Sequence, residues 1–239
     1  MTTIATIATK ARGLVETDST SYPDAELAID LNVWYHKIAT MILDSQDESD
    51  FDDPNHGDYP NLTFALVTAQ RDYTIAVAEK VLKIKRLDVT YDGVNYYRAE
   101  PIDTGDMEGG LGNDTVTDSR FSKTSPRYDY SYGSLFLYPR ASAADVTAGA
   151  QGIVEWQRQI KDITSSDIST GTMVPGIDDP WHAMLAYGAA FEYALKHGHE
   201  KKDDFAAMLV DFEARLKSHY SRKQLDRRYQ FSAENIDYN

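Results

Sequence analysis

An acidic run is the first part of the sequence with residue types suited to metal chemistry. Residues 44–58 hold six aspartates and one glutamate and no lysine or arginine. Asp50 and Asp52 have the spacing of the first two ligands of an EF-hand calcium loop, but the next ligand position is Pro54, which has no side-chain oxygen. We therefore favour a solvated acidic loop over a calcium site.

A histidine pair and a glycine-rich stretch are the other chemical candidates. His197, His199 and Glu200 flank Gly198, where a transition-metal site competes with a cationic helix end that favours the helix dipole; we prefer the second. Residues 105–112 (GDMEGGLG) lack the Lys-Ser/Thr ending of a P-loop. The chain has no cysteine, no G-x-S-x-G elbow and no HExxH motif. We expect no catalytic, cofactor-binding or metal-binding residue, and no enzyme activity.

Basic and aromatic residues are interleaved between residues 73 and 91, as they are on strands that bind single-stranded nucleic acid. The whole chain carries a formal net charge of −14, which opposes sequence-independent binding to phosphates. Lysines on strands more often protect an exposed sheet edge from unwanted pairing, and we favour that role. The residues concerned are Lys80, Lys83, Lys85, Arg86, Tyr73 and Tyr91.

Charge is distributed unevenly along the chain. Residues 217–228 contain five lysines and arginines against one acid, which contrasts with the acidic run 44–58. A solvated loop and a solvated helix end explain this segregation most simply. The sharper hypothesis is that the two poles meet, within one chain or between copies. The candidate interface residues are Asp47, Asp50, Asp52, Asp53, Arg222, Lys223, Arg227, Arg228, Tyr229 and Phe231.

Helical periodicity marks both ends of the chain. Apolar spacing predicts a short helix over 4–14 and a second from Pro23 to about Leu43. A third helix is expected from an Asp179 N-cap to Gly198, and a fourth from about 201 to 228. Residues 188–190 (GAA) would let another helix approach closely.

Alternating polarity predicts strands in the middle of the chain. Residues 70–98 indicate a hairpin with a bulge near Arg86 and a two-residue turn at Asp92-Gly93 with both φ angles positive. Further strands are expected at 133–139 and 152–160. The segment 61–70 fits a short helix or a strand, and 141–152 reads as a turn-rich connection.

These patterns predict an α+β fold. Residues 1–69 and 171–228 are expected to form a discontinuous helical bundle, with the two halves packed together. Residues 70–170 would form a small antiparallel β-sheet insert containing a long surface loop, 103–127. A polar tail, 229–239, follows.

The order of these elements resembles the head-to-tail adaptor proteins of tailed bacteriophages, also called connector, neck or head-completion proteins. The likeness begins with SYPDAELAIDLNVWYHKI, which includes Asn32, and QRDYTIAVAEKVLKIKRLDV. Ala76 departs from the proline common in the family, and the two long loops and the tail are additions. The elements that carry the resemblance are residues 21–38, 70–89, 126–128, 135–139, 152–160 and 174–177.

The resemblance implies a structural virion protein that forms a ring, twelve-fold in related adaptors, beneath the portal. The ring would extend the DNA channel without recognising sequence and would dock the tail or a second neck protein. Such adaptors are often monomeric until the portal offers a template. Absence of cysteine, of an export signal and of a membrane span is expected for assembly in bacterial cytoplasm. A tail-completion or tail-tube protein, or a small enzyme of unrecognised type, is the alternative.

Overall fold

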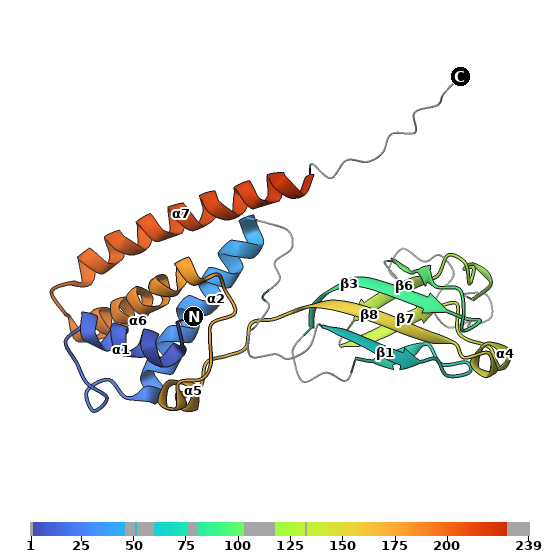
Figure 1. Ribbon diagram of the computed structural model, residues 1–239, viewed down its shortest axis with the longest axis horizontal. Helices are drawn as coiled ribbons and strands as arrows, with labels where there is room; N and C mark the ends of the chain where they lie inside the picture. Colours follow the sequence, from blue (N-terminus) through green and yellow to red (C-terminus); the bar gives the residue numbers. More distant parts are fainter. Residues whose placement is uncertain are drawn as a thin grey trace, which may run out of the picture. The chain divides into compact units, whose positions relative to one another are not determined.

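The chain consists of two compact units (Figure 1). The computed structural model describes residues 2–45, 51, 60–75, 81–102, 118–131 and 133–228, with the backbone alone for 170 and 223–228. Residues 1–57 and 160–239 form the helical unit, and residues 58–159 form the sheet unit. The α+β class is confirmed.

The borders between the units lie earlier in the chain than the predicted ones at 69/70 and 170/171. The first border moves because residues 61–65, whose type the sequence left open, form a strand that pairs within the sheet unit. The second moves because Ile160, Ile163 and Ile168 are buried in the core of the helical unit.

The helical unit combines segments from both ends of the chain. The predicted helices are confirmed, and a further short helix, α5, precedes the third. Arg12 joins the first two helices, since its guanidinium donates to the Tyr22 carbonyl (2.8 Å) and to Asp24 (2.6 Å). The elements are α1 (Ile4–Leu14), α2 (Asp24–Ser45), α5 (Ser165–Thr170), η2 (Asp179–Trp181), α6 (His182–His197) and α7 (Lys202–Arg228).

The start of the third predicted helix differs from the expectation. Asp179 is not its N-cap, because Pro180 lies in the 3-10 turn η2 and the α-helix begins only at His182. The Asp179 carboxylate lies 3.0 Å from Nδ1 of His182. The other end agrees with the prediction: Gly198 has φ 65° and ends α6 in the left-handed conformation that glycine favours.

The core of the helical unit depends on a close approach between α2 and α6. A Cβ atom at Gly188 would lie 2.2 Å from Cγ of Trp34, so only glycine leaves room for the indole ring. The Trp34 indole N–H donates to Glu192 (3.0 Å), and Phe191 meets the ring edge-on. The predicted close approach at residues 188–190 is confirmed.

The sheet unit contains two four-stranded sheets among its described residues, rather than the single sheet predicted. Each sheet has one apolar face, and the two faces share a core that includes Leu87 and Val154 from one and Leu135 and Leu137 from the other. A single sheet in a separate unit would leave such a face exposed, so two sheets pack together. Their strands, in spatial order, are β1 (Asn61–Ala65), β8 (Gln151–Arg158), β3 (Val81–Thr90) and β4 (Tyr97–Arg98), then β2 (Asp72–Thr74), β7 (Ser134–Tyr138), β6 (Arg127–Ser131) and β5 (Glu100–Pro101).

The predicted hairpin is correct in its bulge and wrong in its turn. The register of β3 against β8 shifts between Ile84 and Arg86, as the change of apolar parity indicated. Only Gly93 of the expected turn pair has a positive φ (72°), and the return strand is limited to Tyr97–Arg98. The loop is longer because the Asp92 carboxylate organises it, accepting hydrogen bonds from Thr90, Val94 and Asn95.

Candidate interaction surfaces

The described residues do not bring together the side chains of a metal site. Among the described residues, no group of three His, Cys, Asp or Glu side chains is placed to hold a metal ion. The His197 ring stacks on Tyr193 with centroids 4.2 Å apart, and Nδ1 of His199 accepts the Lys201 amide hydrogen (3.2 Å). Both histidines thus stabilise the turn between α6 and α7. Asp50, Asp52, Pro54 and residues 105–112 lie outside the described ranges.

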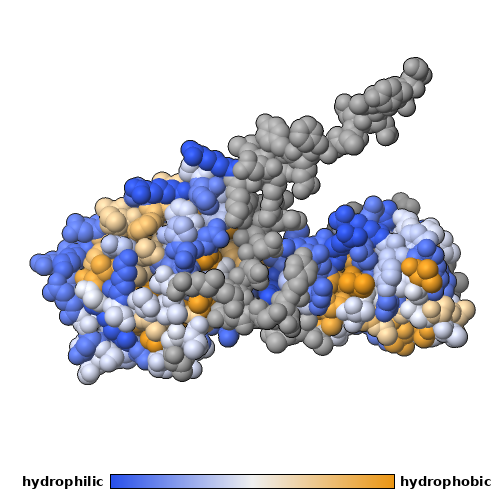
Figure 2. Space-filling model, viewed as in Figure 1, coloured by the Kyte–Doolittle hydropathy of each residue, from blue (hydrophilic) through white to orange (hydrophobic). Residues whose placement is uncertain are grey.

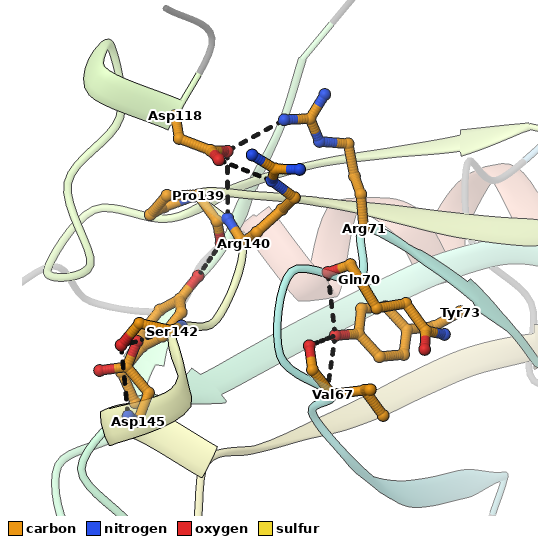
Figure 3. Close-up of polar contacts among 10 residues, drawn as sticks. Val67, Gln70, Arg71, Tyr73, Asp118, Pro139, Arg140, Ser142 and Asp145 are labelled. Atoms are coloured by element: carbon orange, nitrogen blue, oxygen red, sulfur yellow. Dashed lines mark hydrogen bonds and ion pairs between the residues drawn. The ribbon is translucent and has the colours of Figure 1, made fainter. Parts of the chain in front are cut away.

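A carboxylate network fixes three segments of the sheet unit (Figure 3). Asp118 accepts hydrogen bonds from Arg71 Nη2 (3.0 Å), Arg140 Nε (2.7 Å) and the Arg140 amide (3.2 Å). Arg71 comes just before β2, Arg140 just after β7, and Asp118 is the first described residue within the long loop 103–127. These charge-assisted bonds anchor the second half of that loop. The bonds join three segments through one carboxylate, so the cluster is a positioning device.

A separate group of hydrogen bonds holds the connection between β7 and β8. This connection contains a helix, α4 (Ala143–Thr147), in place of the turn-rich stretch predicted there. Ser142 and Asp145 form a reciprocal capping box that makes this short helix possible. Burial raises the pKa of Asp145, but hydrogen bonds from Lys123 and Ser142 outweigh it and lower the pKa on balance. The Tyr91 hydroxyl donates to the Pro139 carbonyl (2.7 Å), and burial raises its pKa.

The structure places only part of the predicted charged interface. Arg222 is exposed on the last turns of α7, and the backbones of Lys223, Arg227 and Arg228 continue the same helix. Phe51, inside the acidic run, is buried in the core of the helical unit and was not predicted there. The signal in the sequence that could have predicted this burial is a single aromatic residue within an otherwise acidic run. Asp47, Asp50, Asp52, Asp53, Tyr229 and Phe231 lie outside the described residues.

Helix α7 exposes apolar as well as basic side chains. Met208 and Val210 are exposed, and Figure 2 shows apolar surface over this helix. The opposite face packs Phe205, Leu209 and Leu216 into the core of the helical unit. The helix therefore has an outer face with both features that protein interfaces use.

The two edges of the β1-containing sheet differ in chemistry. β1 is the terminal strand on one side, and its residues carry no charge. On the other side β4 pairs only with Asp88 and Val89, leaving the first half of β3 with its exposed Lys83. The sequence did not identify the β1 edge, because five residues did not distinguish a strand from a short helix.

Comparisons with known protein families and with curated proteins identify no relative of this chain. No known protein family matches the chain, and no curated protein is significantly similar to it. None of the helices within the described ranges is long and apolar enough to cross a membrane.

Proposed function

We propose that the protein is a structural component of a tailed-phage virion: a head-to-tail adaptor that binds the portal as a ring of copies. The observation that carries the proposal is the architecture itself, a helical unit built from both chain ends with a separate sheet unit inserted between α2 and α5. This order of elements is the one on which the resemblance to adaptors rests. Packaged DNA would pass through the ring, and the tail or a second neck protein would dock on it.

The helical unit supports this role as a rigid body with an outward-facing terminal helix. Hydrogen bonds to Asp30 help to fix its shape: the Tyr22 hydroxyl donates to this carboxylate (2.7 Å), and so does Nζ of Lys196 on α6 (2.8 Å). The 27-residue helix α7 lies along this body and presents Met208, Val210 and Arg222. A ring-forming protein needs one face of each copy to complement another face of the next, and α7 offers such a face.

The charge of the chain supports passage of DNA rather than recognition of it. A net charge of −14 makes a channel wall that repels phosphates weakly, so DNA slides without being held. One of the exposed basic residues of β3 is neutralised, since Arg86 is paired with Asp88 (2.7 Å). We therefore propose that the protein does not recognise DNA sequence. We also propose that it has no enzyme activity and that it assembles in the bacterial cytoplasm.

Mass measurements test the proposal. The adaptor model expects a monomer in solution at low concentration and a large complex of many copies when portal rings are added. Mass photometry or native mass spectrometry of the protein alone, of the portal alone and of the mixture reads this directly. A monomer that ignores the portal contradicts the adaptor role. A protein that forms tubes alone indicates the tail-tube alternative.

A further inference from the structure

The outer edge of β1 is left unpaired by the described strands of the chain. Residues Asn61–Ala65 pair with β8 in one unbroken register, from Asn61 opposite Glu155 to Ala65 opposite Gln151. Among the described strands none pairs with the other side of β1, which is the end of its sheet (Figure 1). An edge of this kind presents backbone N–H and C=O groups that can hydrogen-bond an added strand.

The other edge of the same sheet is protected by the devices that proteins use against such addition. The first half of β3 has two register shifts, between Val81 and Lys83 and between Ile84 and Arg86. Lys83 and Arg86 are exposed there. Bulges and charged side chains disfavour pairing at an edge. β1 has no bulge, charge or proline within its five residues, so its edge is open where its counterpart is guarded.

β1 is also held firmly enough to act as a template. The Phe64 ring covers Gly152 of β8, where a Cβ atom would lie 2.4 Å from Cζ of the ring. The same ring packs on Tyr73 of the other sheet with centroids 5.1 Å apart. Along β1, Leu62 and Phe64 are half-buried, whereas Asn61, Thr63 and Ala65 are exposed. An added strand with the same alternation would extend both faces of the sheet.

The chain contains a segment with this alternation, directly after α7. Residues 229–234 read Tyr-Gln-Phe-Ser-Ala-Glu, with apolar and polar side chains in strict alternation. Placing residues 230–234 beside residues 61–65 puts Phe231 beside Leu62 and Ala233 beside Phe64. Five paired residues span about 17 Å of strand.

Charge selects a parallel orientation. In the sequence, Arg227 and Arg228 precede the tail, and an acidic run precedes β1. Parallel pairing brings these opposite charges to the same end, whereas antiparallel pairing would bring Glu234 and Asp237 of the tail toward the acidic run. Opposite charges side by side stabilise a pairing modestly and like charges oppose it.

We propose that residues 230–234 of a neighbouring copy add to β1 as a parallel strand and so link successive copies. This inference rests on the proposed ring, because a ring requires a heterologous contact repeated between copies. The tail supplies one half of that contact and β1 the other.

Engineered cysteines test the pairing cleanly, because the natural chain has none. One full-length variant carries Thr63→Cys, and a second, with an affinity tag that changes its mass, carries Ser232→Cys. Mild oxidation of the mixture, free at raised concentration and on the portal, should give covalent heterodimers, because the two side chains would face each other. In the matched control, the first variant carries Lys83→Cys, on the opposite edge of the sheet, in place of Thr63→Cys. This control should give no covalent heterodimer.

Each result bears on the proposal. Heterodimers through residue 63 but not residue 83 support it. Equal yields at both edges, or no heterodimer in either condition, overturn it. A chain carrying both Thr63→Cys and Ser232→Cys that cross-links only within itself also overturns it. Rings on the portal without the cross-link leave the adaptor function standing and remove the tail pairing. Heterodimers formed by free protein that never binds the portal support the tail pairing and contradict the adaptor function.

Discussion

The two units of this protein gain their stability in opposite ways. The core of the helical unit joins residues far apart in the chain, as when Asn32 exchanges two hydrogen bonds (2.8 Å each) with the backbone of Ile163. The sheet unit is one continuous segment, 58–159, with a core of its own. One unit therefore needs both chain ends before it can form, whereas the other can form as soon as its segment exists. The helical unit is closed by buried contacts, whereas in the sheet unit none of the described strands pairs with the outer side of β1.

Cutting the chain at the unit borders should show the largest difference. We expect residues 58–159 alone to unfold cooperatively, because their core is internal to the segment. Residues 160–228 alone should not fold as a monomer, because the face of α6 that packs on Trp34 would be exposed. Circular dichroism during thermal unfolding shows whether each fragment unfolds cooperatively, and sedimentation shows whether it is a monomer. A cooperative monomeric transition for 160–228 contradicts this account of the helical unit.

Trp34→Ala should be the most damaging single substitution, and only for the helical unit. It empties the space against Gly188 and removes the bond to Glu192, at an expected cost of about 3–5 kcal/mol in unfolding free energy. The neighbouring Val33→Ala is the control: Val33 is half exposed, and we expect a change within about 0.5 kcal/mol. Urea unfolding followed by circular dichroism measures both. Equal losses in the two variants would show that Trp34 is not central.

Asp118→Ala should weaken the sheet unit by an intermediate amount. The substitution removes the acceptor of three hydrogen bonds from Arg71 and Arg140, whose side chains are largely buried. The expected loss is about 1–3 kcal/mol. Asp72→Ala, at an exposed position on β2, controls for the lost charge. Amide hydrogen exchange should quicken in 118–127 in the first variant only, and unchanged exchange there would refute the anchoring role.

The two units should respond to pH in opposite directions. Asp145 has a lowered pKa in the folded sheet unit, so its contribution is present above the unfolded value of about 3.9 and is lost as pH falls through the folded value. Burial lowers the pKa of Lys196, but bonds to Asp30 and Glu26 outweigh it and raise the pKa. Its contribution to the helical unit is therefore lost as pH rises above about 10.4 and through the folded value.

Unfolding of each unit against pH, compared with Asp145→Asn and Lys196→Gln, measures these contributions. Asp145→Asn should flatten the acid limb of the sheet unit, and Lys196→Gln the alkaline limb of the helical unit. Curves that the substitutions leave unchanged would assign the pH dependence to other groups.

Charge reversal at the end of α7 should have the smallest effect on folding and a selective effect on assembly. Replacing Arg222, Lys223, Arg227 and Arg228 by Glu should leave the melting temperature nearly unchanged, since exposed pairs contribute about 0–1 kcal/mol each. Ring formation on the portal should slow, most at low salt. Deleting 229–239 should weaken attachment in the same way.

Arg215→Glu is the control on the same helix, because Arg215 pairs with Asp211 one turn away and not with another element. It should assemble at the normal rate. Normal rates for the four-residue reversal and for the deletion at low and moderate salt would show that the charge poles are only solvated surface.

The sequence predicted local structure better than pairing. Helices α1, α2 and α7 followed from apolar periodicity, and Gly198 marked an end, because each signal lies within its own segment. The two sheets were missed because β2 pairs with β7 across more than half of the sheet unit, and strand polarity does not name a partner. The Asp118 network was missed for the same reason: its two arginines lie 47 and 22 positions away.

Electron microscopy of the purified full-length protein mixed with its portal tests the central proposal most directly. The adaptor account predicts averaged images in which a second ring of protein density, with an open axial channel, lies against one end of the portal. Portal rings that remain bare at saturating concentrations of the protein would contradict it.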